Sequence, residues 1–289
     1  MWMVGRCQES FKKYNMMSKL FDLSGRIIII TGATGLLGKQ HANAVASAGG
    51  IPVLLDLKAE QIENLVSELQ SNYGVPAQGY VVDITQESEI ENNKIELLNR
   101  FGKIDALVNN AANNPKVEKK GGVNFSRLEN FTLDMWEDDI SVGLTGAFLC
   151  AKYYGTAISK NPKGGVIINI SSDLGLISPD QRIYRQPGQQ KDQQPVKPVT
   201  YSVVKTGLIG LTRYLATYWP ECVRCNVISP GGIYVDQDEK FVQSLSQLIP
   251  MGRMANKDEY EAALIFLLSD ASSYMNGANL VMDGGRSVW

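Results

Sequence analysis

Short apolar runs alternate along this chain with segments in which apolar residues recur every three or four positions. The first run is four isoleucines, Ile27 to Ile30, and β-branched residues in an unbroken run indicate a strand buried on both faces. Similar runs predict strands over 52–56, 79–83, 105–112, 165–172, 223–228 and 279–285, and helical spacing predicts helices over 39–48, 59–73, 87–101, 132–160, 201–219 and 257–269. This order predicts an α/β fold with a doubly wound parallel sheet of about seven strands and helices on both faces.

Three glycines, at positions 32, 35 and 38, follow the isoleucine strand and precede the first predicted helix. Gly32 suits a tight turn, Gly35 lets the backbone approach a pyrophosphate, and Gly38 allows the helix to pack closely. Free N–H groups at the helix N-terminus attract phosphate. The segment therefore predicts a dinucleotide site, which also includes Thr34, Leu36 and Leu37.

Asp56 ends the second strand, 24 residues after Gly32, where a dinucleotide fold places an acid against the adenosine ribose hydroxyls. A carboxylate there repels a 2′-phosphate, so NAD is favoured over NADP, although the nearby Lys58 leaves NADP open. The alternative is an aspartate that only caps the next helix. Asp83 and Ile84, at the end of the third strand, are predicted beside the adenine.

Composition narrows the class of protein. The chain has 289 residues, is 44% hydrophobic and carries 28 basic and 30 acidic residues, so one large core is feasible and nothing suggests nucleic-acid binding. It has no run of 18 apolar residues, so we expect no membrane span. Residues 1–20 do not resemble a signal peptide and are predicted to be an N-terminal tail before a single domain, 21–289, in the cytoplasm.

The four cysteines and the single histidine offer little chemistry. Cys222 and Cys225 have the spacing of a metal or redox pair, but no second pair accompanies them and Cys225 lies in an apolar strand. Buried thiols in a reducing compartment are the simpler interpretation. His41 lies in the first helix, so we expect neither a metal site nor a histidine-based nucleophile.

Five motifs in order, TGATGLLG, LVNNAA, Ser172 with Tyr201-x-x-x-Lys205, NVISPGGI and VMDGG, resemble the short-chain dehydrogenase/reductase family over residues 23–286. The resemblance implies a Rossmann-like fold and a homo-oligomer, a tetramer or a dimer. It places Asn109, Asn110, Ala111 and Ala112 against the cofactor's ribose and nicotinamide, and Pro230, Gly231 and Ile233 beside the nicotinamide amide. The glycine spacing itself resembles the sugar-nucleotide branch of the superfamily.

Tyr201 and Lys205 are spaced i, i+4 at the start of a helix, so both side chains share one face. A tyrosine pKa is about 10, and a nearby lysine cation is expected to lower it enough for proton transfer. The resemblance identifies Ser172 as the serine that binds the reacting oxygen, and implies that Lys205 also reaches the ribose. The three residues predict hydride transfer with a tyrosine acid or base.

Two features depart from the family. Gly143 stands where the family usually has an asparagine that holds a relay water. Residues 177–199 form an insertion before Tyr201, and its Arg182, Tyr184 and Arg185 are predicted to contact a polar substrate, the alternative being an exposed loop or a subunit contact. The charged segment 236–248 is predicted to be a mobile lid.

The preferred hypothesis is an NAD-dependent oxidoreductase that acts on a secondary alcohol or ketone of a polar small molecule, in sugar or nucleotide-sugar metabolism. The chain also resembles the oxidoreductases of bacterial flagellin modification and legionaminic-type sugar synthesis. Two alternatives remain open: a 3-oxoacyl-thioester reductase or non-redox sugar dehydratase or epimerase on the same fold, and a non-catalytic dinucleotide-binding subunit. The intact Ser172, Tyr201 and Lys205 argue against the second.

Overall fold

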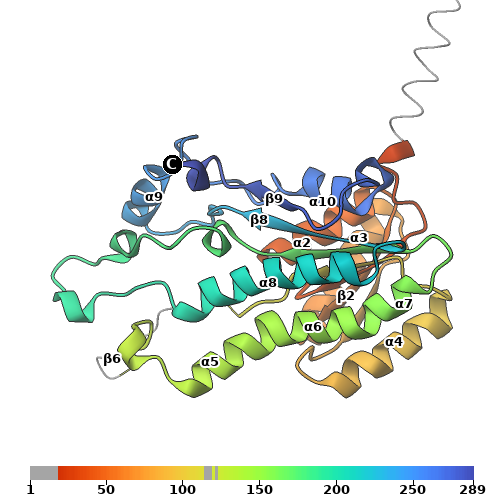
Figure 1. The fold of residues 1–289 in the computed structure, drawn as a ribbon, viewed down its shortest axis with the longest axis horizontal. Helices are drawn as coiled ribbons and strands as arrows, with labels where there is room; N and C mark the ends of the chain where they lie inside the picture. The colour runs from red at the N-terminus through yellow and green to blue at the C-terminus, as the bar shows by residue number, and fades with distance from the viewer. Residues whose placement is uncertain (1–18, 114–118, 121–122) are drawn as a thin grey trace, which may run out of the picture.

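The computed structural model describes residues 19–113, 119–120 and 123–289 (Figure 1). Its centre is a parallel sheet of seven strands in the order β3-β2-β1-β4-β7-β8-β9. The strands are β1 (Ile27–Thr31), β2 (Ile51–Asp56), β3 (Gln78–Val81), β4 (Ala106–Asn109), β7 (Gly165–Ile170), β8 (Val223–Pro230) and β9 (Asn279–Met282). The predicted fold class is confirmed, and the predicted tail lies almost wholly outside the described residues.

The isoleucine strand lies inside this sheet and contributes side chains to the apolar clusters on both of its faces. β1 pairs in parallel with β2 on one side and with β4 on the other, and all five of its residues are buried. Ile28 and Ile30 join one apolar cluster, whereas Ile27 and Ile29 join the other. A strand covered on both faces needs apolar residues at every position, which is why the run does not alternate.

Helices cover both faces of the sheet. One apolar cluster contains residues of α2 (Leu36–Ser47), α3 (Ala59–Tyr73) and α10 (Glu261–Leu268). The other contains residues of α4 (Glu87–Phe101), α6 (Gly146–Cys150), α7 (Thr156–Ser159) and α8 (Val199–Tyr218). Figure 1 shows the two groups on opposite sides of the strands.

The long helix predicted over 132–160 is continuous, but it contains two π-helical turns. α5 (Leu133–Ile140) begins at Thr132, whose hydroxyl accepts a hydrogen bond from the Met135 N–H, as expected for an N-cap. The π-turns Ser141–Thr145 and Ala151–Gly155 separate α5 from α6 and α6 from α7. Such turns shift the side chains that follow and often occur at functional sites.

The remaining elements are short. The predicted loop 113–130 contains a two-stranded ladder of β5 (Lys119–Lys120) and β6 (Val123–Asn124) and a 3₁₀ turn (Leu128–Asn130). Other 3₁₀ turns are Asp173–Gly175, Gln181–Tyr184, Lys191–Gln193, Asp270–Ser272 and Arg286–Val288. The segment predicted to be a mobile lid contains a helix, α9 (Glu239–Ser246), which Asp238 caps and whose Leu245 is buried. Its role as a lid stays a prediction.

Candidate active site

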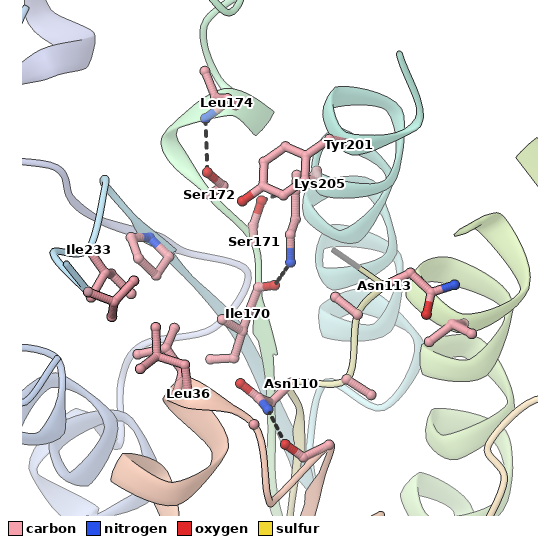
Figure 2. A pocket seen from close by; sticks show the side chains of 18 of the residues that line it. Leu36, Asn110, Asn113, Ile170, Ser171, Ser172, Leu174, Tyr201, Lys205 and Ile233 are labelled. Atoms are coloured by element: carbon pink, nitrogen blue, oxygen red, sulfur yellow. Dashed lines mark hydrogen bonds between the residues drawn. The ribbon is translucent and has the colours of Figure 1, made fainter. Parts of the chain in front are cut away.

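A cavity of about 680 Å³ runs along the carboxyl edge of the sheet, where parallel strands deliver their following loops (Figure 2). Most of the residues predicted for the site line it. They are Gly32, Thr34, Gly35, Leu36, Leu37, Asp56, Asp83, Ile84, Asn110, Ala111, Ala112, Ser172, Tyr184, Tyr201, Lys205, Pro230, Gly231 and Ile233. The structure therefore brings together residues that are up to 201 positions apart in sequence, from Gly32 to Ile233.

The glycine turn forms one end of this cavity, and two of its glycines have no room for a side chain. A Cβ on Gly32 would lie 2.8 Å from the Ala111 Cα, and a Cβ on Gly38 would lie 2.2 Å from the Gly32 carbonyl oxygen. Gly35 precedes α2, and no side chain caps the N-terminus of this helix. Its N–H groups and positive dipole end are available to a phosphate, so the residues fit a dinucleotide.

Hydrogen bonds between Asn110 and Thr31, which we call the Asn110 latch, hold the glycine turn against the end of β4. The Asn110 amide donates to the carbonyls of Thr31 and Gly32, both at 3.0 Å, and the Thr31 hydroxyl accepts the N–H groups of Asn110 and Ala111 at 3.1 Å. Asn109 does not face the cavity, which corrects the role that the resemblance implied. Its amide is buried and donates to Asn169 Oδ1 at 2.9 Å, because successive strand residues point to opposite faces.

Asp56 lies beside the same turn. One carboxylate oxygen accepts the Thr34 N–H at 2.9 Å, and the other accepts the Leu57 N–H at 2.8 Å. The next helix, α3, begins at Lys58 without a side-chain cap, so Asp56 does not serve that helix. The carboxylate is thus fixed where the strand spacing predicted it, next to the loop that would hold the cofactor.

Ser172, Tyr201 and Lys205 meet on the opposite wall. Figure 2 shows Tyr201 and Lys205 projecting from α8 toward Ser172, which follows β7. The Lys205 ammonium is buried, donates to the Ile170 carbonyl at 2.9 Å and lies 5.8 Å from the centre of the Tyr201 ring. Ser172 Oγ donates to the Asp173 carboxylate at 2.8 Å and accepts the Leu174 N–H at 3.2 Å.

The electrostatics of Tyr201 differ from the prediction. Burial raises the pKa of the phenol, and a hydrogen bond with Ser172 only partly opposes that rise. The pKa of Tyr201 therefore shifts in the direction opposite to the prediction, because burial and the Asp173 carboxylate both raise it. Burial and the nearby Lys197 ammonium also lower the pKa of Lys205 to about 8. The tyrosine is therefore held as a neutral phenol that can donate a proton.

A buried ion pair that the sequence did not predict supports the serine. The Arg286 guanidinium lies 2.8 Å from the Asp173 carboxylate, and the side chains are 6% and 3% exposed. Asp173 also accepts a hydrogen bond from the Ser172 hydroxyl. This carboxylate therefore competes with the Tyr201 oxygen for the hydrogen bond that Ser172 donates. The Asp283 carboxylate fixes the turn before Arg286 by accepting the N–H groups of Gly285 and Ser287.

The insertion packs over the cavity, but its arginines do not reach it, which corrects their predicted role. Arg182 pairs with Asp180 and has a side chain that is 73% exposed, and Arg185 is also exposed. Tyr184 does line the cavity, with its ring centre 5.6 Å from that of Phe241 of α9. The cation that the insertion contributes is Lys197, whose ammonium lies 3.7 Å from the centre of the Tyr201 ring. Its spacing of four residues from Tyr201, matching that of Lys205, was the signal available in the sequence.

Packing explains the glycine that replaces the family's asparagine. A Cβ on Gly143 would lie 2.6 Å from Cγ1 of Val204, which α8 presents to the first π-turn. Contacts of that length do not occur, so any larger residue would displace the helix that carries Tyr201 and Lys205. Gly143 and Val204 thus fit each other as a pair.

Among the described residues, the cysteines and the histidine that the sequence offered as candidates have no part in the cavity. Cys150 and Cys225 are buried, and burial raises the pKa of both thiols, that of Cys225 to about 12. Burial also lowers the pKa of His41 to about 4. In the described part of the chain, no group of three or more histidine, cysteine or acidic side chains could hold a metal ion. No helix there is both long and apolar enough to cross a bilayer.

Comparison with known proteins shows what the whole chain is similar to. A family model described as short chain dehydrogenase matches residues 26–184, and one described as enoyl-(acyl carrier protein) reductase matches residues 189–287. An NADP-dependent mannitol dehydrogenase of Hypocrea jecorina is 32% identical over 95% of this chain and 97% of its own. An NAD-dependent glycerol dehydrogenase of Listeria innocua is 29% identical over 93% of this chain and 97% of its own.

A solved structure gives the same picture. The gluconate 5-dehydrogenase of Burkholderia cenocepacia, in complex with NADP and tartrate, superposes with a TM-score of 0.80. It is 26% identical and covers 94% of this chain and 99% of its own. The similarity therefore extends over most of both chains.

Proposed function

The chain belongs to the short-chain dehydrogenase/reductase family, and from that premise we propose that it interconverts a secondary alcohol and a ketone on a small polyol. The observation that carries the proposal is the placement of Ser172, Tyr201 and Lys205 on one wall of the cavity, opposite the glycine turn. Relatives named for mannitol and glycerol support a substrate with several hydroxyls.

Each residue has a defined task in this reaction. In reduction, the Tyr201 phenol donates its proton to the carbonyl oxygen, and in oxidation the phenolate removes the proton from the alcohol. Ser172 holds the same oxygen within reach of Tyr201. Lys205 stabilises the phenolate through its charge and would also hold the cofactor's ribose. A bound nicotinamide supplies the hydride acceptor or donor that completes the redox change.

The cofactor we propose is NAD. One carboxylate oxygen of Asp56 accepts the Thr34 N–H of the turn that would hold the adenosine ribose, and a 2′-phosphate there would meet like charge. The relatives include both NADP- and NAD-dependent enzymes, so relationship alone does not choose between them. The nucleotide-sugar substrate, the link to flagellin modification and the homo-oligomer stay predictions.

A coupled absorbance screen tests the proposal. Polyols, ketoses, sugar phosphates, nucleotide sugars and acyl thioesters are each incubated with NAD or NADH, and the 340 nm signal is followed. We expect turnover with polyols or their ketones, and a loss of about 10² to 10⁴-fold in Tyr201→Phe with NADH binding retained. Turnover of acyl thioesters alone, or full activity in Tyr201→Phe, would overturn the proposal.

A further inference from the structure

Lys197 is a charged residue that lines the cavity and for which the mechanism above gives no task. It lies two residues before α8, at the end of the insertion, and lines the cavity next to Tyr201. Lys197 and Lys205 stand four residues before and four residues after Tyr201. Lys205 has a role in that mechanism, whereas Lys197 has none.

The backbone around Lys197 is held firmly in place. The Lys197 N–H donates to Gln181 Oε1 at 2.8 Å, and the Val196 N–H donates to Ser126 Oγ at 3.0 Å. Arg127 donates to the carbonyls of Lys191 and Gln194. The position of the ammonium is therefore set by the folded insertion, and it does not depend on a loose loop.

The other cations near this end of the cavity have oxygen partners. Lys205 donates to the Ile170 carbonyl, Arg286 pairs with Asp173, and Arg182 pairs with Asp180. In the part of the chain that the structure describes, the Lys197 ammonium has no carboxylate within 4 Å and no hydrogen-bond acceptor, only the face of the Tyr201 ring at 3.7 Å. Burial lowers the pKa of Lys197 to about 8, against the smaller opposing effect of Asp173. A cation that loses hydration without gaining an acceptor is costly, and an anion would offset that cost.

The charge around Lys197 favours a negative ligand. Three cations, Lys197, Lys205 and Arg286, line this part of the cavity against one carboxylate, Asp173, which Arg286 already neutralises. The apolar side chains of Ile183, Leu245 and Met254 also line the cavity, and a less polar surrounding strengthens an interaction between opposite charges.

We infer that Lys197 binds an oxyanion of the substrate, so that the polyol is an acid whose carboxylate is held beside Tyr201 while its hydroxyl reacts. This inference rests on the proposed function and adds the substrate class to it. A carboxylate carries one negative charge, which the unpaired Lys197 ammonium offsets, whereas a phosphate carries a charge of about −1.5 to −2 at neutral pH. Alternatively, the ammonium only packs on the Tyr201 ring and binds no substrate, and in that case the enzyme would show no preference for acids.

The test measures selectivity and uses Lys197→Met with Lys191→Met as the matched control. Lys191 belongs to the same insertion but is exposed and does not line the cavity. For each protein, kcat/KM is measured with hexitols, with the corresponding hexonates and with hexitol phosphates. The quantity compared is the ratio of the acid to the neutral polyol, because a general loss through Tyr201 cancels in that ratio.

We expect the unmodified protein and Lys191→Met to prefer the hexonate, and Lys197→Met to lower the hexonate-to-hexitol ratio by about 10 to 100-fold. Lys197→Arg should retain most of the ratio and serves if the methionine variant does not fold. A hexonate-to-hexitol ratio that is unchanged in Lys197→Met overturns the inference while leaving the proposed function intact. A preference for the phosphate that Lys197→Met removes would keep the oxyanion site and overturn the carboxylate. Failure of every polyol and acid would instead overturn the proposed function.

Discussion

The two ends of the cavity are lined by different kinds of chemical group. The cofactor end consists of backbone groups and short side chains from neighbouring segments: the glycine turn, Asp56 and the Asn110 latch. Its shape depends on the absence of side chains, since a Cβ on Gly38 would overlap the Gly32 carbonyl. Such a site recognises what all dinucleotides share, which is a pyrophosphate and a ribose.

The substrate end is built from charged and bulky side chains brought from distant parts of the chain. Arg286 from the C-terminal segment meets Asp173, and Lys197 and Tyr184 come from the insertion to meet Tyr201 and Phe241. The comparison indicates that the cofactor end sets the class of reaction and the substrate end sets which molecule undergoes it.

The largest effect should come from breaking the ion pair that holds the substrate end. Asp173→Ala leaves the Arg286 guanidinium buried and unpaired, and we expect the free energy of unfolding to fall by about 3–5 kcal/mol in urea titrations. Adding Arg286→Met should restore most of that loss, because an apolar side chain needs no partner.

An exposed pair provides the control for that measurement. Lys152 and Glu87 also form an ion pair, but both side chains are 49% exposed, so Lys152→Met should leave the free energy of unfolding almost unchanged. Equal losses in Asp173→Ala and Lys152→Met would mean that the long-range pair does not stabilise the substrate end.

A smaller effect is expected where α8 packs on the first π-turn. Gly143→Ala should destabilise the protein by about 1–3 kcal/mol, because its Cβ would meet Val204 at 2.6 Å. Gly210→Ala, in α8 with nothing within 4 Å of its Cβ, should be neutral or stabilise by up to about 1 kcal/mol. Thermal unfolding compares the two variants, and Gly143→Ala with Val204→Ala should recover stability. Without that recovery, Gly143 would have a role other than packing.

The same contrast explains what the sequence could predict. The glycine turn, Asp56 and the Tyr201–Lys205 pair depend on local spacing, and the structure places all of them on the cavity. Arg286 and Asp173 lie 113 residues apart, so no local pattern signals that they meet. The insertion drew attention to Arg182 because of its charge, but Asp180, two residues away, satisfies that arginine. α9 was missed because its charged composition conceals the buried Leu245.

The cofactor end can be tested through Asp56. Asp56→Ser removes the carboxylate while keeping a hydroxyl that could accept the Thr34 N–H. We expect the ratio of NADPH to NADH affinity, measured by fluorescence titration, to rise by about 10 to 100-fold, since like-charge repulsion of the 2′-phosphate is lost. The hexonate-to-hexitol ratio should not change, because Asp56 lies at the other end. A change in that ratio would show that the two ends are not independent.

The smallest effect is expected when the charge of Lys197 is changed by pH and the sequence is left unaltered. Burial lowers its pKa to about 8, so the ammonium is present at pH 7 and largely lost at pH 9. The hexonate-to-hexitol ratio of kcat/KM should therefore fall by about tenfold between these values, as a carboxylate remains ionised throughout. Asp173, Tyr201 and Lys205 also face this ammonium, and the pKa of Lys205 is likewise lowered to about 8. Titration of Tyr201 affects both substrates and cancels in the ratio, whereas loss of charge on Lys197 or on Lys205 weakens binding of the acid, and the Lys197→Met variant separates the two lysines. In Lys197→Met the ratio should be low and independent of pH, and a ratio that still fell between pH 7 and pH 9 would assign the titration to another group.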